Sequence, residues 1–225
     1  MIENRPDWCL SRQRLWGVPI PVFKCKSCGD YLISSEVMRN VADKMEEGDG
    51  INTYFEKDAN EFTKGHKCSS CGHEDFDKGK DILDVWFDSG ICHSAVQRKR
   101  DGLEEVADLY LEGSDQHRGW FQTSLLTSVA AHNKAPYKNV LTHGFANDLK
   151  GRKMSKSLGN SFLPTQLVTG NHDMLEQGYS PMTVRFFMMQ THYSSTLDFS
   201  NEALKAAQKG YRRLANGLKI IKSLV

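Results

Sequence analysis

Two lysines stand close together in a glycine-flanked segment, GRKMSKSLGN, at residues 151–160. Lys153 and Lys156 are three residues apart, and the glycines on either side are typical of a mobile loop. Cationic side chains on a loop that closes over a nucleotide can stabilise the charge developing on a departing pyrophosphate. A Lys-x-x-Lys pattern alone is more often a solvated loop, so its interpretation depends on the surrounding segments.

Four cysteines form two C-x-x-C-G motifs with 39 residues between them: Cys25, Cys28, Cys68 and Cys71. Each motif lets two thiolates face one ion, and the glycine that follows permits the tight turn. Two such motifs supply a tetrahedral four-thiolate site, which suits structural zinc. The interval is longer than in the usual zinc ribbon, and four thiolates leave no open position for catalysis.

Other interpretations of the cysteines stay open at this point. One alternative is that the thiols are unpaired, and another is that one pair is redox-active. Within a metal site, His66 or His73 could replace a cysteine ligand. Cys9 and Cys92 lie outside the pattern, and we expect them to be ordinary small buried residues.

A carboxylate and an amide, Asp115 and Gln116, lie in the segment GSDQHRGW at a predicted strand-to-helix junction. Such a junction can hydrogen-bond a ribose, and the start of the helix favours anionic groups. Asp115 alone is more simply a helix cap. Trp86 and Trp120 have large apolar side chains, and most tryptophans of this kind lie in the protein core.

The elements around these residues follow from apolar spacing and turn signals. Residues 109–116 and 139–145 indicate strands, and 120–132 a helix between them, which predicts a parallel crossover with ligand groups at the carboxyl ends of the strands. Prolines 19 and 21 favour an extended segment. Residues 181–193 and those from Asn201 onward indicate amphipathic helices, the second with Ser200 as its N-cap.

The bulk composition excludes some classes of protein. The 225 residues are 39% hydrophobic, and 29 lysines and arginines balance 28 acidic residues, so no global basic field indicates nucleic-acid binding. The C-terminal 25 residues are locally basic. No apolar run reaches membrane-spanning length and no signal peptide is recognisable, so we expect a soluble, cytoplasmic protein.

KMSKS resembles the second signature of class I aminoacyl-tRNA synthetases. The stretches DWCLSRQRLWGVPIPVF, DILDVWFDSG, YLEGSDQHRGWFQ and HGFANDLKGRKMSKSLGN are similar to isoleucyl-tRNA synthetases, from residue 1 to about 160. The resemblance implies an α/β fold: the second half of a class I Rossmann-type parallel sheet, with an inserted zinc module and a C-terminal helical segment. The implied domains are 1–23 with 80–160 (catalytic half-domain), 24–79 (zinc-knuckle insertion) and 161–225 (helical stem-contact region).

The resemblance also implies roles for individual residues. Lys156 matches the ATP-binding lysine, with Lys153 assisting it, and Trp86 and Trp120 match the walls of the isoleucine pocket. ATP or adenylate binding is implied for Glu112, Gly113, Asp115, Gln116, His143, Gly144, Met154, Ser155 and Ser157. The zinc module corresponds to Cys25, Cys28, Cys68 and Cys71.

The sequence departs from the family in two places. No H-x-G-H first signature occurs, and no editing domain precedes DWCLSRQR, so we expect the second half of a catalytic domain, with Met1 not its natural start. Residues 161–225 resemble cysteinyl-tRNA synthetase more, which predicts a possible chimera. The basic residues of that tail contact tRNA phosphates or form a solvated helix face.

The leading hypothesis is an isoleucine–tRNA ligase fragment that uses ATP with magnesium, isoleucine and tRNA as partners, together with the missing N-terminal half of its catalytic domain. The alternatives are a cysteinyl enzyme, a non-catalytic nucleotide- or tRNA-binding module, and a purely structural zinc protein.

Overall fold

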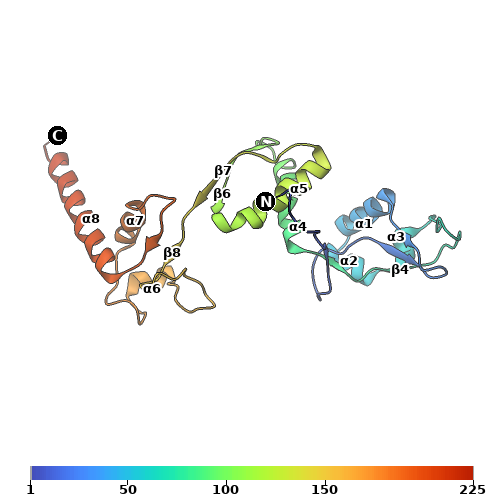
Figure 1. Ribbon diagram of the computed structural model, residues 1–225, viewed down its shortest axis with the longest axis horizontal. Coiled ribbons are helices and arrows are strands. Elements are labelled where there is room, and N and C mark those ends of the chain that lie inside the picture. The colour runs from blue at the N-terminus through green and yellow to red at the C-terminus, as the bar shows by residue number, and fades with distance from the viewer. Residues whose placement is uncertain (1, 225) are drawn as a thin grey trace. The chain divides into compact units, whose positions relative to one another are not determined.

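The computed structural model describes residues 2–224. The chain divides into two compact units, which we describe separately (Figure 1). The first comprises Met1–Ala107 and His117–Lys138, and the second comprises Asp108–Gln116 and Asn139–Val225. Among the described residues, no helix is both long and apolar enough to cross a membrane.

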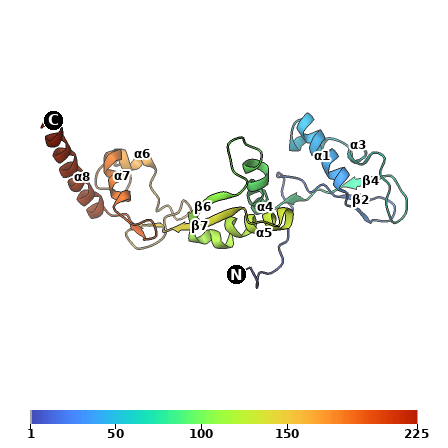
Figure 2. The same cartoon turned by 90° about the horizontal axis from the view of Figure 1, so that it is seen from above.

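A three-stranded antiparallel sheet, in the order β3-β2-β4, organises one part of the first unit. Its strands are β2 (Phe23–Cys25), β3 (Tyr31–Leu32) and β4 (Phe76–Lys78). Three helices accompany it: α1 (Ser35–Glu47), α2 (Ile51–Glu56) and α3 (Ala59–Thr63), and Figure 2 shows α1 beside β2 and β4. A shared core holds the group together: Phe23, Cys25, Val37, Val41, Tyr54, Phe62, Cys68 and Phe76.

The first unit also contains a pair of packed helices. β1 (Ser11–Arg12) pairs antiparallel with β5 (Ile82–Leu83), and α4 (Val85–Gly90) follows directly, before a short π-helix at His93–Gln97. α5 (Trp120–His132) packs against α4. The two backbones approach closely at Gly90, where a Cβ would lie 3.2 Å from Thr123.

The buried face of α5 is more polar than its sequence indicates. The predicted helix 120–132 is confirmed, but small polar side chains fill much of its buried face, including Thr123, Ser124 and Ser128. Thr127 Oγ1 lies 3.1 Å from the Gly90 carbonyl oxygen, and Ser128 Oγ lies 2.7 Å from that of Lys134. These hydroxyls satisfy backbone carbonyls, so their burial leaves no polar group unpaired.

The lysine-containing loop, residues 151–160, belongs to the second unit, together with most of two longer strands. β6 (Ala107–Gly113) pairs with β7 (Tyr137–His143), and a 3₁₀ turn at Ser114–Arg118 follows β6. β8 (Ala146–Asn147) pairs parallel with β9 (Leu197–Asp198). The predicted strands 109–116 and 139–145 are therefore present, with slightly earlier bounds.

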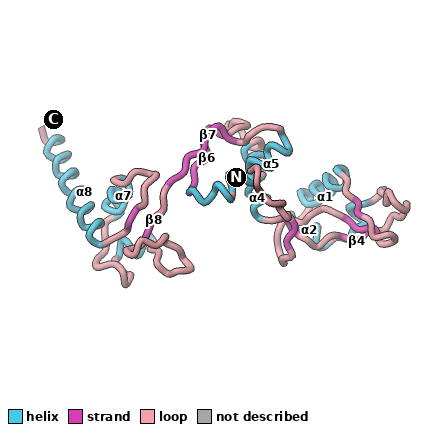
Figure 3. Tube along the Cα trace, in the orientation of Figure 1, coloured by secondary structure: helices cyan, strands magenta, loops and turns pink. Residues whose placement is uncertain are grey.

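Three helices complete the second unit: α6 (Pro164–Thr169), α7 (Pro181–Met189) and α8 (Asn201–Lys222). α7 ends earlier than the predicted 181–193, whereas α8 is one continuous helix (Figure 3). Ser200 caps α8 as predicted, because its side chain accepts a hydrogen bond from the Ala203 amide. Their common core comprises Leu167, Tyr179, Val184, Phe187, Phe199, Leu204 and Ala207.

Candidate functional site

The two lysines of the KMSKS loop have different surroundings. Lys153 Nζ lies 3.5 Å from Asp115 Oδ2 and 3.7 Å from the centre of the Phe145 ring, a cation–π contact. The Lys156 side chain is exposed and, within residues 2–224, makes no hydrogen bond or ion pair. The first lysine is therefore held beside the β6 turn, and the second is available to a ligand.

Neighbouring loop residues are partly ordered by the fold. The Met154 amide donates to the Ala146 carbonyl at 2.9 Å, and its side chain packs on the core of the second unit. Ser155 and Ser157 hydroxyls lie 3.1 Å apart, and Ser155 Oγ accepts from the Leu158 amide. Met154 and Ser155 are thus half-buried in the middle of the loop, whereas residues 151–153 and 156–159 are exposed.

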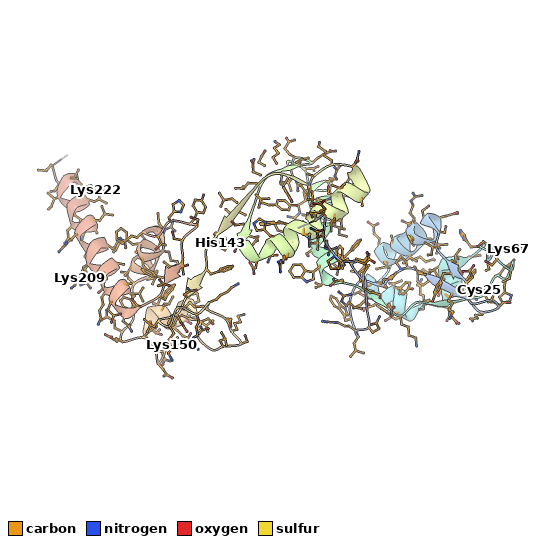
Figure 4. All side chains as sticks on the ribbon, viewed as in Figure 1. Cys25, Lys67, His143, Lys150, Lys209 and Lys222 are labelled. Atoms are coloured by element: carbon orange, nitrogen blue, oxygen red, sulfur yellow. The ribbon has the colours of Figure 1, made fainter. Side chains whose placement is uncertain are left out.

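A buried carboxylate lies at the base of this loop, two positions before Lys150, which Figure 4 labels. The Asp148 side chain is only 2% exposed and accepts two hydrogen bonds from the Arg152 guanidinium, at 2.9 and 2.7 Å. Hydrogen bonds from the Asn160 amide and from Arg152 hold the pKa of this carboxyl well below its usual range. Asp148 is therefore charged at any physiological pH.

The turn after β6 brings several predicted ligand residues together. Gly113 is buried, and a Cβ there would lie 2.7 Å from Asp115 Oδ1 and 2.8 Å from Phe145 Cε1. A side chain at this point of the turn would therefore have to displace the Asp115 carboxylate and the Phe145 ring. Glu112 is exposed on β6, and Gln116 is half-buried within the 3₁₀ turn.

His143 and Gly144 occupy the end of β7. His143 Nδ1 lies 2.7 Å from the Gly144 carbonyl oxygen, and the Gly144 amide donates to the Tyr193 carbonyl at 2.8 Å. A Cβ on Gly144 would collide with the Ser195 backbone. The close backbone approach explains the glycine, so this residue first of all serves packing.

Trp86 and Trp120 both belong to the α4–α5 pair of the first unit. Trp86 is 43% exposed and lines a cavity of about 500 Å³ with residues that include Arg12, Trp16 and Asp88. Trp120 is half-buried, and its indole N–H donates to the Ser89 carbonyl at 3.0 Å. Trp120 is not among the residues that line that cavity.

Asp84 orients the start of α4 and, with it, Trp86. Asp84 is 5% exposed, and its carboxylate accepts hydrogen bonds from Trp8 Nε1 at 2.9 Å and from Arg12 at 2.8 Å. It also caps α4 by accepting from the Trp86 amide. In this network the Asp84 carboxylate is buried and the Arg12 side chain is 35% exposed, so the cation keeps contact with solvent while hydrogen bonds satisfy the buried partner.

The four cysteines converge on one point, as predicted. Their sulfur atoms all lie within 4.8 Å of one another, with 3.6 Å between Cys25 and Cys71 and 3.5 Å between Cys28 and Cys68. A disulfide requires about 2.05 Å, whereas a tetrahedron with zinc–sulfur bonds of about 2.3 Å has edges of about 3.8 Å. The spacing therefore fits a shared metal ion.

The local backbone shapes both cysteine motifs and favours the thiolate form at Cys25. The two motifs form equivalent turns, because the Gly29 amide bonds the Cys25 carbonyl and the Gly72 amide bonds the Cys68 carbonyl, both glycines having positive φ. A hydrogen bond from the backbone of Cys28 lowers the pKa of Cys25 to about 6. At neutral pH this sulfur is mainly a thiolate, the form that binds metals.

The two histidines near the motifs lie outside the cysteine cluster, and the two remaining cysteines differ in exposure. His66 and His73 pair with the carboxylates of Glu36 and Asp75, and the cluster of candidate ligands within residues 2–224 contains neither histidine. The prediction that Cys9 is buried is wrong: Cys9 is exposed because most of the chain around it lies on the surface. Cys92 is half-buried.

Sequence reasoning missed the residues that hold the loop. Asp148, Phe145 and Asn160 were not singled out, although all three lie within the quoted stretch HGFANDLKGRKMSKSLGN. A usable signal existed: Asp148 precedes and Asn160 follows a glycine-bounded loop, and both are residues that commonly hydrogen-bond turns.

Comparison with known proteins extends this picture. The family described as tRNA synthetases class I (I, L, M and V) matches residues 1–200. The isoleucine–tRNA ligase of Syntrophotalea carbinolica is 50% identical over 222 residues, 98% of this chain and 23% of that protein. That of Aquifex aeolicus is 48% identical over 223 residues, 98% of this chain and 22% of its own length. The chain thus spans about a quarter of these relatives.

A solved structure shares the fold. The leucyl enzyme of Agrobacterium radiobacter K84, in a ternary complex with tRNA and LeuAMS, matches 93% of this chain and 27% of its own chain, with a TM-score of 0.61 and 22% identity.

The alignments with isoleucine–tRNA ligases also correct the expectation for residues 161–225. They cover 98% of this chain, so the similarity continues through the tail that was predicted to be cysteinyl-like. The prediction of a chimera is therefore wrong. The chain belongs to the class I tRNA synthetases of the isoleucine, leucine, methionine and valine group.

Proposed function

We propose that this chain is part of an isoleucine–tRNA ligase, which activates isoleucine with ATP and transfers it to tRNA in the cytoplasm. The choice of isoleucine as the amino acid is supported by a relative of this name that is 50% identical to the chain. The observation that carries the proposal is the position of Lys153, 3.5 Å from the Asp115 carboxylate. The signature loop and the turn proposed to bind adenosine thus meet within one unit.

The proposed chemistry needs no protein nucleophile. An isoleucine carboxylate oxygen attacks the α-phosphorus of ATP, the bond to the bridging oxygen breaks, and pyrophosphate leaves with the electron pair and its magnesium. Lys153 and Lys156 stabilise the negative charge on that leaving group. The terminal ribose of tRNA then attacks the adenylate carbonyl, and AMP departs.

The remaining site residues are proposed to take the roles that the family resemblance implies. Gly113, Asp115 and Gln116 form the adenosine turn, Glu112 contacts the adenylate, and His143 and Gly144 border the nucleotide at the end of β7. Met154, Ser155 and Ser157 complete the loop around the phosphates. Trp86 and Trp120 border the isoleucine side chain.

The four-cysteine cluster is proposed to hold structural zinc. Four thiolates close the coordination sphere, which suits a structural ion. Residues 24–79 form the inserted zinc module in this proposal, between the parts 1–23 and 80–160 of the catalytic half-domain. Two of the ligands, Cys25 and Cys68, lie in the core of the first unit, so the ion would tie the sheet to the loop that precedes β4.

Residues 161–225 are proposed to contact the tRNA stem. α8 presents exposed cations along its length, including Lys209 and Lys222 (Figure 4). Lys205 is already paired with Glu176. Each phosphate contact would add to the salt dependence of tRNA binding, whereas a merely solvated face would leave it unchanged.

The decisive experiment places this chain in the context of a full-length relative. This chain replaces the matching 222-residue segment of the S. carbinolica isoleucine–tRNA ligase, and ATP–pyrophosphate exchange is measured with isoleucine, valine and cysteine side by side. We expect exchange with isoleucine well above that with either competitor. The isolated chain is assayed in parallel and, lacking the first signature, should show none.

Two outcomes would contradict the proposal. A folded chimera without isoleucine-dependent exchange would favour a non-catalytic synthetase-like module. Exchange that prefers valine or cysteine would assign the chain to another member of the class. The matched control is the unaltered S. carbinolica enzyme, expressed and assayed under the same conditions.

A further inference from the structure

Asp148 and Asn160 lie at the two ends of the signature loop, and both are buried, at 3% exposure each. Asn160 Nδ2 donates to Asp148 Oδ2 at 3.0 Å, so the pair closes the loop at its base. Asp148 Oδ1 also accepts from the backbone amides of Lys150 and Arg152, at 2.9 and 3.0 Å. The Asp148 carboxylate therefore binds the first part of the loop, residues 150–152, through two backbone amides and through the Arg152 side chain.

Asn160 holds the centre of the loop. Its Nδ2 also donates to the Lys153 carbonyl at 3.3 Å, and its Oδ1 accepts from the Ser155 amide at 2.9 Å. These two bonds flank Met154, which is itself tied to Ala146 through its amide. The backbone from Lys153 to Ser155 is thus fixed on both sides by one buried side chain.

The fixed region stops before the second lysine. Lys153 forms a β-bridge with Asn147 and so continues the edge of β8. From Lys156 to Gly159 the residues are exposed, including Leu158 at 61%. Beyond the Ser155 amide, the turn at 155–158 has a hydrogen bond from the Leu158 amide to Ser155 Oγ and one from the Gly159 amide to the Lys156 carbonyl.

We infer that Asp148 and Asn160 are positioning residues that clasp the signature loop, fixing Lys153 beside Asp115 while leaving Lys156 on a segment free to move. The catalytic meaning of this division rests on the proposed function, but the clasp itself does not. In that reaction, Lys153 is preorganised for the nucleotide, and Lys156 approaches when the loop closes. Preorganised charge costs no rearrangement at the moment of reaction.

Charge, and not only shape, is essential to the clasp. Each partner of the Asp148 carboxylate in this loop is an N–H donor: the Arg152 guanidinium, the Asn160 amide and two backbone amides. An asparagine at position 148 keeps the volume but directs its own NH₂ at donors on one side. A buried donor without an acceptor is unfavourable, so the loop should open locally.

The test is hydrogen exchange by mass spectrometry on the 225-residue chain, comparing Asp148→Asn with the parent. We expect the amides of residues 150–155 to exchange at least about 10-fold faster, with α7 and α8 unchanged. Asp173→Asn is the matched control, because Asp173 is an exposed carboxylate of the same unit, and it should leave every segment unchanged.

A second variant keeps the inference testable if Asp148→Asn does not fold. Asn160→Ala removes the bonds to Lys153 and Ser155 but leaves the Arg152–Asp148 pair, so exchange should rise at 154–155 more than at 150–152. Unchanged amide exchange in residues 150–155 would overturn the clasp, because Asp148 and Asn160 would then not hold the loop. A rise of equal size throughout α7 and α8 would also overturn it, because the substitution would then destabilise the whole unit.

A kinetic experiment distinguishes a positioning role of Asp148 from an effect on stability. In the S. carbinolica chimera, Asp148→Asn should lower the rate of pyrophosphate exchange about 10-fold or more, with the KM for isoleucine within about twofold. An equal loss in both parameters would overturn the positioning role. Failure of the unmodified chimera to use isoleucine would count against the proposed function instead, while the exchange pattern of the isolated chain still decides the clasp.

Discussion

At the scale of single residues, the two lysines of one short motif are held in unlike ways. Lys153 contacts a carboxylate and an aromatic ring, whereas the Lys156 side chain is exposed. Both partners of Lys153 come from outside the loop, and its ion pair is half-exposed, so this contact orients the side chain more than it stabilises the fold. The difference gives the two lysines different expected phenotypes.

In the chimera, Lys156→Ala should slow pyrophosphate exchange about 100-fold while changing the KM for isoleucine less than about threefold. The reason is that the cation acts on charge that is largest in the transition state. Lys150→Ala, an exposed lysine just before the motif, is the matched control and should behave as the parent. Equal losses in rate and in isoleucine affinity would argue against the assigned role.

The pH dependence of the loop follows from the low pKa of Asp148. A carboxyl whose pKa falls on folding stabilises the folded state above its ordinary value of 3.8, and the stabilisation is lost as the pH falls through the depressed value. The other groups around it, including Phe162, Met174 and Phe199, do not ionise, and Arg152 stays charged.

The loop should therefore stay clasped down to pH 4. The NMR signal of the Arg152 Nε–H reports the hydrogen bond directly, and its chemical shift should be constant between pH 7 and pH 4. A titration of that signal with a midpoint near 4 would show that Asp148 has an ordinary carboxyl pKa. The Arg212 Nε–H, on exposed α8, provides the internal reference.

At the scale of elements, α2 shows how a distant residue completes a helix. Lys78 of β4 donates its ammonium group to the carbonyls of Tyr54, Phe55 and Lys57 at the C-terminal end of α2, and lies 5.5 Å from the Tyr54 ring centre. A cation is favourable there because the last carbonyls of a helix lack partners. Burial lowers the pKa of Lys78.

Lys78→Met should destabilise α2 by about 1–2 kcal/mol, because the methionine fills space but cannot donate to the carbonyls. Hydrogen exchange of the α2 amides measured against urea concentration gives the free energy of opening. Lys80→Met, at an exposed position two residues on, is the control and should change this free energy by less than about 0.5 kcal/mol. Equal effects of the two substitutions would show that the cap contributes nothing.

At the scale of the whole molecule, the part of the chain that the structure describes has one hydrophobic core in each unit. Two of the four clustered cysteines, Cys25 and Cys68, belong to the first core, and Met154 of the signature loop packs on the second. Metal binding and loop positioning are therefore expected to respond to different perturbations.

The purified chain should contain about one zinc ion, and chelation should raise exchange in β2, β3 and β4 while leaving α7 and α8 protected. A structural zinc site contributes its binding free energy to folding of the part that contains it. Metal content by mass spectrometry and segment-resolved exchange measure the two effects. Cys25→Ser should abolish zinc binding, and Cys9→Ser should not. A metal-free chain with a protected β2–β4 sheet would contradict the zinc site.

The sequence by itself determined the features that depend on near neighbours. Helix 120–132, the Ser200 cap and the two cysteine turns all rest on residues a few positions apart, whose spacing is fixed by backbone geometry. The stretch around KMSKS also indicated the family that the comparisons then showed.

The tertiary structure decided which of those residues are held and which are free. Lys153 contacts Asp115 across 38 positions, Lys78 reaches α2 across more than 20, and Asp148 and Asn160 are buried 12 positions apart. Burial of a polar group depends on what packs over it and on whether distant donors satisfy it. Local spacing does not contain that information, which is why the sequence identified both lysines but not the residues that separate their roles.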